Sequence, residues 1–205
     1  MGSQIVRRLK TLGKHVITTS ATEILGCDNI TSSEDVLRLV CDSSISLAEA
    51  QVGLILSHRY REENIQAALG NELRITRDFV WSLSKLCASL RVVVLGSIAG
   101  RLVDRKMPES YHYSKDLQKS IVRQSVRIGS LYMNLIELNW FEKYTGHNAT
   151  DEYSQIMLDL KQKLGGDNLP TVDSITDFAC ALIEMQRPPR GETIVYDGGL
   201  SLFQI

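Results

Sequence analysis

The sequence predicts a single α/β domain with a parallel sheet that is covered by helices on both sides. Short β-rich runs alternate with longer helix-compatible stretches along the chain, and residues 91–95 (RVVVL) form the strongest β-branched run. Continuous runs of this kind are typical of parallel strands that are buried on both faces. The 205 residues contain no internal repeat, low-complexity segment or clear linker. We therefore expect one domain over residues 1–205.

The individual elements follow from periodicity. Residues 5–12 carry apolar side chains at positions 5, 6, 9 and 12, which is the spacing of a helix with one buried face, and Gly13 is expected to end that helix. The remaining expected strands are 15–19, 36–40, 52–56, 91–95, 130–138 and 193–196, and the remaining expected helices are 64–90, 114–128, 150–164 and 176–184. Strands that alternate with helices in this way favour a parallel sheet.

Composition excludes several classes of partner. Lys and Arg total 23 against 24 for Asp and Glu, so no excess of positive charge is available to attract nucleic acid or an anionic membrane. The apolar runs, such as 92–95, are far shorter than the ~18 residues of a membrane-spanning helix. No secretory leader pattern is present, so we expect a cytoplasmic protein.

The cysteines and histidines show no metal-binding pattern. Cys27, Cys41, Cys87 and Cys180 are scattered, without a Cys-x-x-Cys pair and without a histidine at ligand spacing. We therefore expect reduced thiols and no metal site.

The candidate chemistry follows the strongest strand. Residues 91–95 lead directly into residues 96–100 (GSIAG), and ligands of parallel α/β sheets bind at the carboxyl ends of the strands, so Ser97 is a candidate active-site hydroxyl. Tyr111 and Lys115 follow, four residues apart, and share a face if a helix begins there. An ammonium beside a phenol lowers the tyrosine pKa from about 10, which makes Tyr111 a usable proton donor and acceptor near neutral pH. Each motif alone is also typical of a structure without catalytic function: a Tyr-x3-Lys pair of a solvated helix face, and a Gly-Ser-x-x-Gly loop of an ordinary turn. Their combination favours a catalytic site.

This combination resembles the short-chain dehydrogenase/reductase family. Residues 96–100 and 111–115 resemble the family's serine loop and its Tyr-x3-Lys motif, and residues 191–199 (GETIVYDGG) resemble its closing strand with the Val-Asp-Gly-Gly signature. Residues 2–19 resemble the helix that follows the glycine-rich loop together with the second strand. The resemblance covers nearly the whole chain and implies a Rossmann-like, doubly wound parallel sheet.

The resemblance also implies a reaction: reduction of a small-molecule carbonyl, or oxidation of an alcohol, with NADP or NAD. Tyr111 would donate a proton to the substrate oxygen, and Ser97 would hydrogen-bond the same oxygen. Lys115 would lower the tyrosine pKa and hold the nicotinamide ribose. Asp42 resembles the acidic residue that contacts the adenine, and Gly2 corresponds to the last glycine of the phosphate-binding turn. The implied cofactor-binding residues are therefore Gly2, Asp42, Tyr111 and Lys115.

The sequence departs from the family pattern mainly where the cofactor binds. The family's first, central strand and its glycine-rich turn have no counterpart before Gly2. Loss of that strand is expected to expose unpaired backbone on both neighbouring strands, so either the given sequence starts late or the sheet is rebuilt without it. Residues 56–59 (LSHR) replace the family's Asn-Asn-Ala-Gly loop. The catalytic asparagine of the family falls near Ala68, and Asn71 is out of step with it.

Two interpretations of these departures stay open. In one, the chain is an active reductase with altered cofactor affinity, in which Ser97, Tyr111 and Lys115 carry the reaction. In the other, it is a family member that no longer turns over and serves as a partner subunit or binding module. Family members are often dimers or tetramers, and the apolar residues 200–205 (LSLFQI) fit burial in a subunit interface. We therefore expect a homo-oligomer, with a mixed oligomer or packing on the chain's own domain as alternatives.

Overall fold

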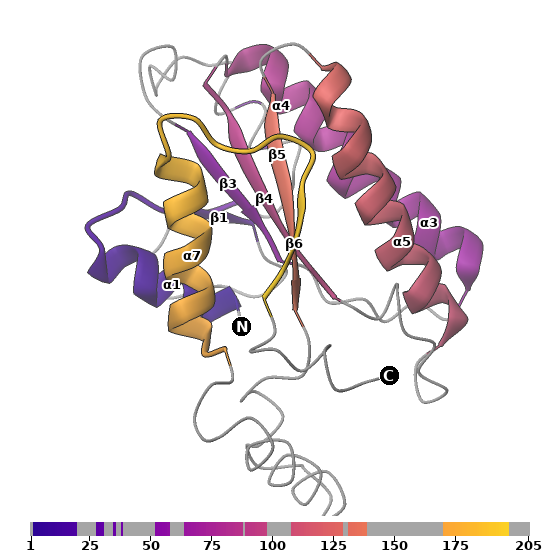
Figure 1. Ribbon diagram of the computed structural model, residues 1–205, viewed down its shortest axis with the longest axis horizontal. Coiled ribbons are helices and arrows are strands. Elements are labelled where there is room, and N and C mark those ends of the chain that lie inside the picture. The colour runs from indigo at the N-terminus through magenta and orange to yellow at the C-terminus, as the bar shows by residue number, and fades with distance from the viewer. Residues whose placement is uncertain are drawn as a thin grey trace, which may run out of the picture.

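A parallel sheet between two helical layers forms the structure (Figure 1). The computed structural model describes residues 2–19, 28–30, 35, 38, 52–57, 64–87, 89–97, 108–128, 131–138 and 170–196. Over this part of the chain the doubly wound α/β architecture is confirmed, because helices lie on both faces of the sheet. Within the same residues, no helix is both long and apolar enough to cross a membrane.

The described strands form two parallel sheets. The larger has the order β3 (Gly53–Leu56), β4 (Arg91–Ser97), β5 (Tyr132–Leu138) and β6 (Thr193–Val195). The smaller pairs β1 (Ile17–Thr19) with β2 (Asp28–Ile30). Among the described strands, none is hydrogen-bonded to the edge of β3 that faces away from β4.

The helices separate into two groups. One face of the large sheet is covered by α3, α4 and α5, and the other by α1 and α7 (Figure 1). Their bounds are α1 Gly2–Thr11, α3 Ile65–Glu72, η1 Leu73–Phe79 (a π-helical segment), α4 Val80–Leu86, α5 Glu109–Gln124, η3 Ser125–Arg127 (a 3-10 turn) and α7 Val172–Glu184. The first layer therefore packs on the sheet through α5, and the second through α7.

Alternate side chains of β4 pack into two hydrophobic cores, one on each face of the large sheet. Val92 and Val94 belong to the core beneath α4 and α5, while Val93 and Leu95 belong to the core beneath α1 and α7. Because both faces of this strand are buried, its sequence is apolar throughout rather than alternating. The strand predicted at residues 91–95 is confirmed and extends to Ser97.

Two glycines adopt a left-handed backbone where the chain turns. Gly13 has φ 71° and follows α1, and its N–H donates to the carbonyl of Lys10 at 2.9 Å while Lys14 N–H donates to Leu9 at 3.0 Å. This is a Schellman ending, and it confirms the predicted end of the first helix. Gly191 also has φ 71° and lies just before β6, where its N–H donates to the carbonyl of Met133 at 2.9 Å.

Some predicted elements differ from the structure. The strand predicted at 36–40 is wrong at Arg38, the described residue of that range, which is helical. The partner of β1 is instead β2, whose Asp28 and Asn29 are residues that strands generally avoid, so their pairing depends on the neighbouring backbone. The helix predicted at 114–128 begins earlier, at Glu109. The helix predicted at 150–164 and the apolar residues 200–205 lie outside the described residues.

The start of α7 also differs from the prediction. The helix predicted at 176–184 begins at Val172, directly after a capping box. Ser174 N–H donates to Oγ1 of Thr171, and Thr171 N–H donates to Oγ of Ser174, both at 3.0 Å. These bonds satisfy backbone donors that the first helical turn leaves without partners, and they place the start of the helix at Val172, four residues before the predicted start.

Candidate active site

The predicted site residues lie on β4 and α5, at the carboxyl edge of the large sheet. Ser97 is the last residue of β4, and α5 begins at Glu109 near the same edge (Figure 1). Tyr111 lies in the first turn of α5, where its N–H donates to the carbonyl of Pro108 at 2.9 Å. Both Ser97 and Tyr111 are half-buried.

Lys115 lies one helical turn after Tyr111, and the structure brings the two side chains together. The Nζ atom of Lys115 is 5.5 Å from the centroid of the Tyr111 ring. At this distance the ammonium and the electron-rich ring attract each other. The lysine side chain is buried, with a relative exposure of 5% for the residue. A buried lysine is uncommon, and its placement next to a tyrosine separates this pair from an ordinary solvated helix face.

A glutamine connects Lys115 to the end of β4. Lys115 Nζ donates to Oε1 of Gln118 at 3.1 Å, and Gln118 is fully buried. The same oxygen would lie 3.4 Å from a Cβ atom placed on Gly96, and Leu135 Cδ1 would lie at 2.7 Å. A side chain at position 96 would therefore contact Gln118 and would require the Leu135 side chain to shift. Through Gln118, Lys115 is therefore connected to Gly96, the strand residue that precedes Ser97.

Burial and a nearby carboxylate act in opposite directions on Lys115. Loss of hydration lowers the pKa of the Lys115 ammonium from its usual 10.5, and the negative charge of Glu72 raises it. Glu72 is the last residue of α3 and has an exposure of 0%. It accepts a hydrogen bond from Ser114 Oγ at 2.9 Å and another from Thr76 Oγ1. The buried cation therefore has a buried anion in the neighbouring helix.

The inward face of α5 changes character along its length. Its buried residues are polar or charged from Ser110 to Lys119 and apolar at Ile121 and Val122. Lys119 Nζ lies 2.9 Å from Oε1 of Glu137, and the two side chains are 10% and 1% exposed. Glu137 lies on β5 opposite Gly96 in the strand register. The polar half of α5 is therefore the half that lies near the carboxyl ends of β4 and β5.

The cofactor-binding residues expected from the resemblance are only partly placed. Gly2 begins α1, a helix of the opposite layer, and a Cβ atom built on it meets no atom within 4 Å. The N-terminal end of α1 nevertheless lies at the same edge of the sheet as the start of α5 (Figure 1). Asp42 lies outside the described residues.

Four polar residues of this region were not predicted from the sequence: Glu72, Gln118, Lys119 and Glu137. Two signals could have found some of them. Gln118 and Lys119 lie three and four residues after Lys115, on the same side of one helix. Glu137 is a carboxylate in an otherwise mainly apolar strand, residues 132–138.

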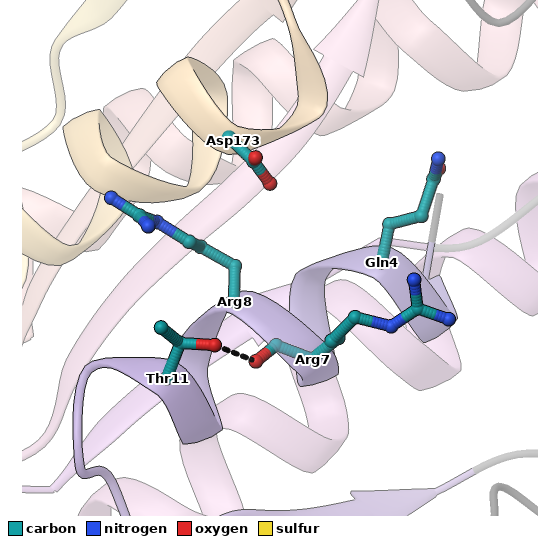
Figure 2. Close-up of a pocket in the computed structure, with 5 residues that line it drawn as sticks. All are labelled: Gln4, Arg7, Arg8, Thr11 and Asp173. Atoms are coloured by element: carbon teal, nitrogen blue, oxygen red, sulfur yellow. Dashed lines mark hydrogen bonds between the residues drawn. The ribbon is translucent and has the colours of Figure 1, made fainter.

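A hollow lies between α1 and α7 (Figure 2). It has a volume of about 240 Å³ and is lined by Gln4, Arg7, Arg8, Thr11 and Asp173. Figure 2 shows the Arg8 side chain directed toward α7 and the Arg7 side chain directed toward Gln4. Arg8 forms two 2.8 Å hydrogen bonds with Asp177 of α7. The hollow is therefore part of the packing interface between α1 and α7, and none of the predicted site residues lines it.

In the part of the chain that the structure describes, neither a metal-binding cluster nor a reactive cysteine adds a further site. No group of three or more histidine, cysteine, aspartate or glutamate side chains within the described ranges is arranged to hold a metal ion. Cys87 and Cys180 are buried free thiols, and burial raises the pKa of both thiols. Cys27 and Cys41 lie outside the described residues.

Comparison with known proteins gives a likeness in fold. No family model matches the sequence, and no curated protein matches it. Among solved structures, a short-chain dehydrogenase/reductase variant from Serratia marcescens is 19% identical with a TM-score of 0.67, over 98% of this chain and 93% of that chain. The enoyl-acyl carrier protein reductase of Bacillus cereus, solved with NADP+ and an indole naphthyridinone, is 14% identical with a TM-score of 0.68, over 98% and 91%.

A third solved structure gives the same picture. The gluconate 5-dehydrogenase of Burkholderia cenocepacia, solved with NADP and tartrate, is 14% identical with a TM-score of 0.65, over 98% of this chain and 91% of that chain. Likeness at this level of identity shows the fold.

Proposed function

We propose that this chain, whose fold is that of the short-chain dehydrogenases/reductases, is an NADP- or NAD-dependent oxidoreductase that acts on a small-molecule carbonyl or alcohol through Ser97, Tyr111 and Lys115. One observation carries the proposal. A buried lysine lies beside a tyrosine ring, at the edge of the sheet where β4 ends in Ser97. A buried titratable group with a perturbed pKa and a specific charge partner favours a functional site over a solvated surface.

The donor groups at this edge fit a dinucleotide. The first turn of α1 contains no acidic side chain, and the space around Gly2 is open. A helix N-terminus of this kind offers backbone N–H groups to phosphate oxygens. The ammonium of Lys115 and the hydroxyl of Tyr111 offer donors to ribose hydroxyls. We propose that Gly2, Asp42, Tyr111 and Lys115 hold the cofactor, whose nicotinamide gives or accepts the hydride when it is bound.

Each side chain of the site has a separate task in this proposal. In reduction, the Tyr111 hydroxyl donates its proton to the substrate oxygen, and in oxidation the phenolate accepts a proton from the alcohol. The Ser97 hydroxyl donates a hydrogen bond to the same oxygen as negative charge grows there. The Lys115 ammonium stabilises the phenolate that remains after the proton has left.

Nucleotide binding is the first test. The purified protein is titrated with NADPH and then with NADH while the nicotinamide fluorescence is followed, and saturable binding is expected. No binding at millimolar nucleotide would contradict the proposal and favour the non-catalytic alternative, a partner subunit or binding module. The expectations of a cytoplasmic location and of a homo-oligomer stay predictions.

Catalysis is tested next, on whichever carbonyl compound the protein reduces in a screen. Tyr111→Phe removes the hydroxyl and should abolish reduction while the nucleotide Kd and the Tm stay close to those of the parent. Tyr113→Phe is the matched control, because Tyr113 lies on the same helix and is 52% exposed. Equal activity of Tyr111→Phe and the parent would overturn the catalytic assignment.

A further inference from the structure

Glu72 is a carboxylate enclosed between helices. Its exposure is 0%, and glutamate is almost never fully buried unless it is paired. Ser114 Oγ on α5 donates to Oε2 at 2.9 Å, and Thr76 Oγ1 on η1 donates to Oε1. Because hydroxyls from two different elements hold the two oxygens, the position of the negative charge is fixed relative to α5.

The residue that follows Ser114 is Lys115. Besides Lys115 and the half-buried Tyr111, the buried charged groups on this part of α5 and on the elements packed against it are Glu72 on α3, Lys119 on α5 itself and Glu137 on β5. The other charged and titratable groups on α5 and η1 are exposed or only partly buried: Glu109, His112, Tyr113, Asp116, Arg123, Arg74, Arg77 and Asp78. Lys119 and Glu137 pair with each other at 2.9 Å. The negative charge of Glu72 acts on the Lys115 ammonium and opposes the effect of burial.

We infer that Glu72 is a positioning residue of the site: from across the α3–α5 interface it keeps the Lys115 side chain charged beside Tyr111. This inference rests on the proposed function. A lysine buried without a nearby anion tends to lose its proton, and a neutral amine would no longer stabilise a phenolate. The competing explanation is a structural one, in which Glu72 only ties α3 to α5 through Ser114.

Charge and hydrogen bonding can be separated by substitution. Glu72→Gln keeps the size of the side chain and removes its charge. Glu72→Asp keeps the charge but moves it away from α5 by the length of one methylene group. Thr76→Val removes one hydrogen bond to the carboxylate but leaves its charge in place. Alcohol oxidation requires the phenolate, so the acid limb of the pH profile of kcat should move up by about 1 pH unit or more in Glu72→Gln. The acid limb of Glu72→Asp should lie at a pH between those of Glu72→Gln and the parent. The acid limb of Thr76→Val should lie at the same pH as that of the parent.

A second measurement needs no turnover. Two-dimensional NMR of the Cε–Hε groups follows the titration of Lys115 in the nucleotide-free protein, and Lys115→Arg assigns its signal by deletion. The midpoint for Lys115 should fall by about 1 pH unit or more in Glu72→Gln. If Glu72→Gln does not fold, Glu72→Asp decides the question, because withdrawing the carboxylate should also lower the midpoint.

The outcomes separate the two proposals. An unchanged Lys115 midpoint in the Glu72 variants overturns the inference, whether or not the protein turns over substrate. A shifted midpoint in a protein that binds no nucleotide and reduces no carbonyl overturns the proposed function, while the coupling between Glu72 and Lys115 is supported. A shifted midpoint together with a shifted acid limb supports both.

Discussion

Lys119 on α5 and Glu137 on β5 form an ion pair inside the protein, with 2.9 Å between Nζ and Oε1. Both side chains are almost completely removed from water, so each charge depends on the other for stabilisation. The pair connects the helix that carries Tyr111 and Lys115 to the strand that lies beside the end of β4.

Removing one partner of this pair should be costly. Lys119→Met or Glu137→Leu alone leaves the charge of the other residue buried without its partner, and we expect a loss of about 3–5 kcal/mol in the free energy of unfolding. The double variant Lys119→Met/Glu137→Leu, which buries neither charge, should lose much less than the sum of two single losses. Urea unfolding of the four proteins measures this, and additive losses would show that the two residues act independently.

The hydroxyl of Ser97 should matter for the rate of the proposed reaction. Ser97→Ala removes a donor at the position where negative charge develops, and we expect kcat to fall by about 10²-fold with little change in nucleotide Kd. Ser84→Ala is the control, because the Ser84 hydroxyl donates to the carbonyl of Trp81 within α4 and lies outside the site. Parent-like kcat in Ser97→Ala would remove Ser97 from the reaction.

The two left-handed glycines allow backbone strain to be separated from steric overlap. Gly13→Ala adds a methyl group in open space, so only the left-handed conformation should cost energy, about 1–2 kcal/mol. Gly191→Ala has the same φ of 71° but places Cβ 2.5 Å from Cγ1 of Val126. We expect a further loss of about 1–3 kcal/mol from overpacking. Equal losses in the two variants would show that Val126 moves aside freely.

The lowered pKa of Lys115 predicts how stability depends on alkaline pH. Below the folded-state pKa both states hold the proton, and the cost of burying the ammonium is fully present. Between that pKa and 10.5 the unfolded state holds more protons, so the lysine's contribution to stability rises with pH and then levels off. The free energy of unfolding of the parent, relative to Lys115→Met, should therefore increase with pH over this range.

Two buried thiols also change the free energy of unfolding in this alkaline pH range. Cys87 and Cys180 have pKa values raised above 9.0 by burial, so their contribution to stability falls with rising pH. Both thiols are present in the parent and in Lys115→Met, so the difference between the two proteins reports on Lys115. A difference that stays constant with pH would show that the folded-state pKa of this lysine is ordinary.

The sequence predicted the fold where local patterns decide it. The uninterrupted apolar run at residues 91–95 indicated a strand buried on both faces, and the periodicity of residues 5–12 indicated a helix with one buried face. The resemblance built on Ser97 and the Tyr111–Lys115 motif predicted the fold that the solved structures share, and that prediction is confirmed.

Other features depend on partners that lie far away in the sequence. The strand β2 contains Asp28 and Asn29 and becomes a strand by pairing with β1, for which no local signal exists. Glu72 lies 42 residues from Ser114, its hydrogen-bond partner. A charged residue is expected at the surface unless its partner is known, so the burial of Glu72 could not be predicted from the sequence.

The division of α5 into a polar half and an apolar half has a consequence for its motions. Ile121 and Val122 anchor the second half in the core, whereas the first half is held by hydrogen bonds and by the ion pair of Lys119, with Leu117 only partly buried against the core. Local opening of the first half exposes little apolar surface, so its amide hydrogens should exchange with solvent more readily than those of the second half. The end of the helix that carries Tyr111 could then rearrange around a bound molecule while the other end keeps the sheet and its core intact.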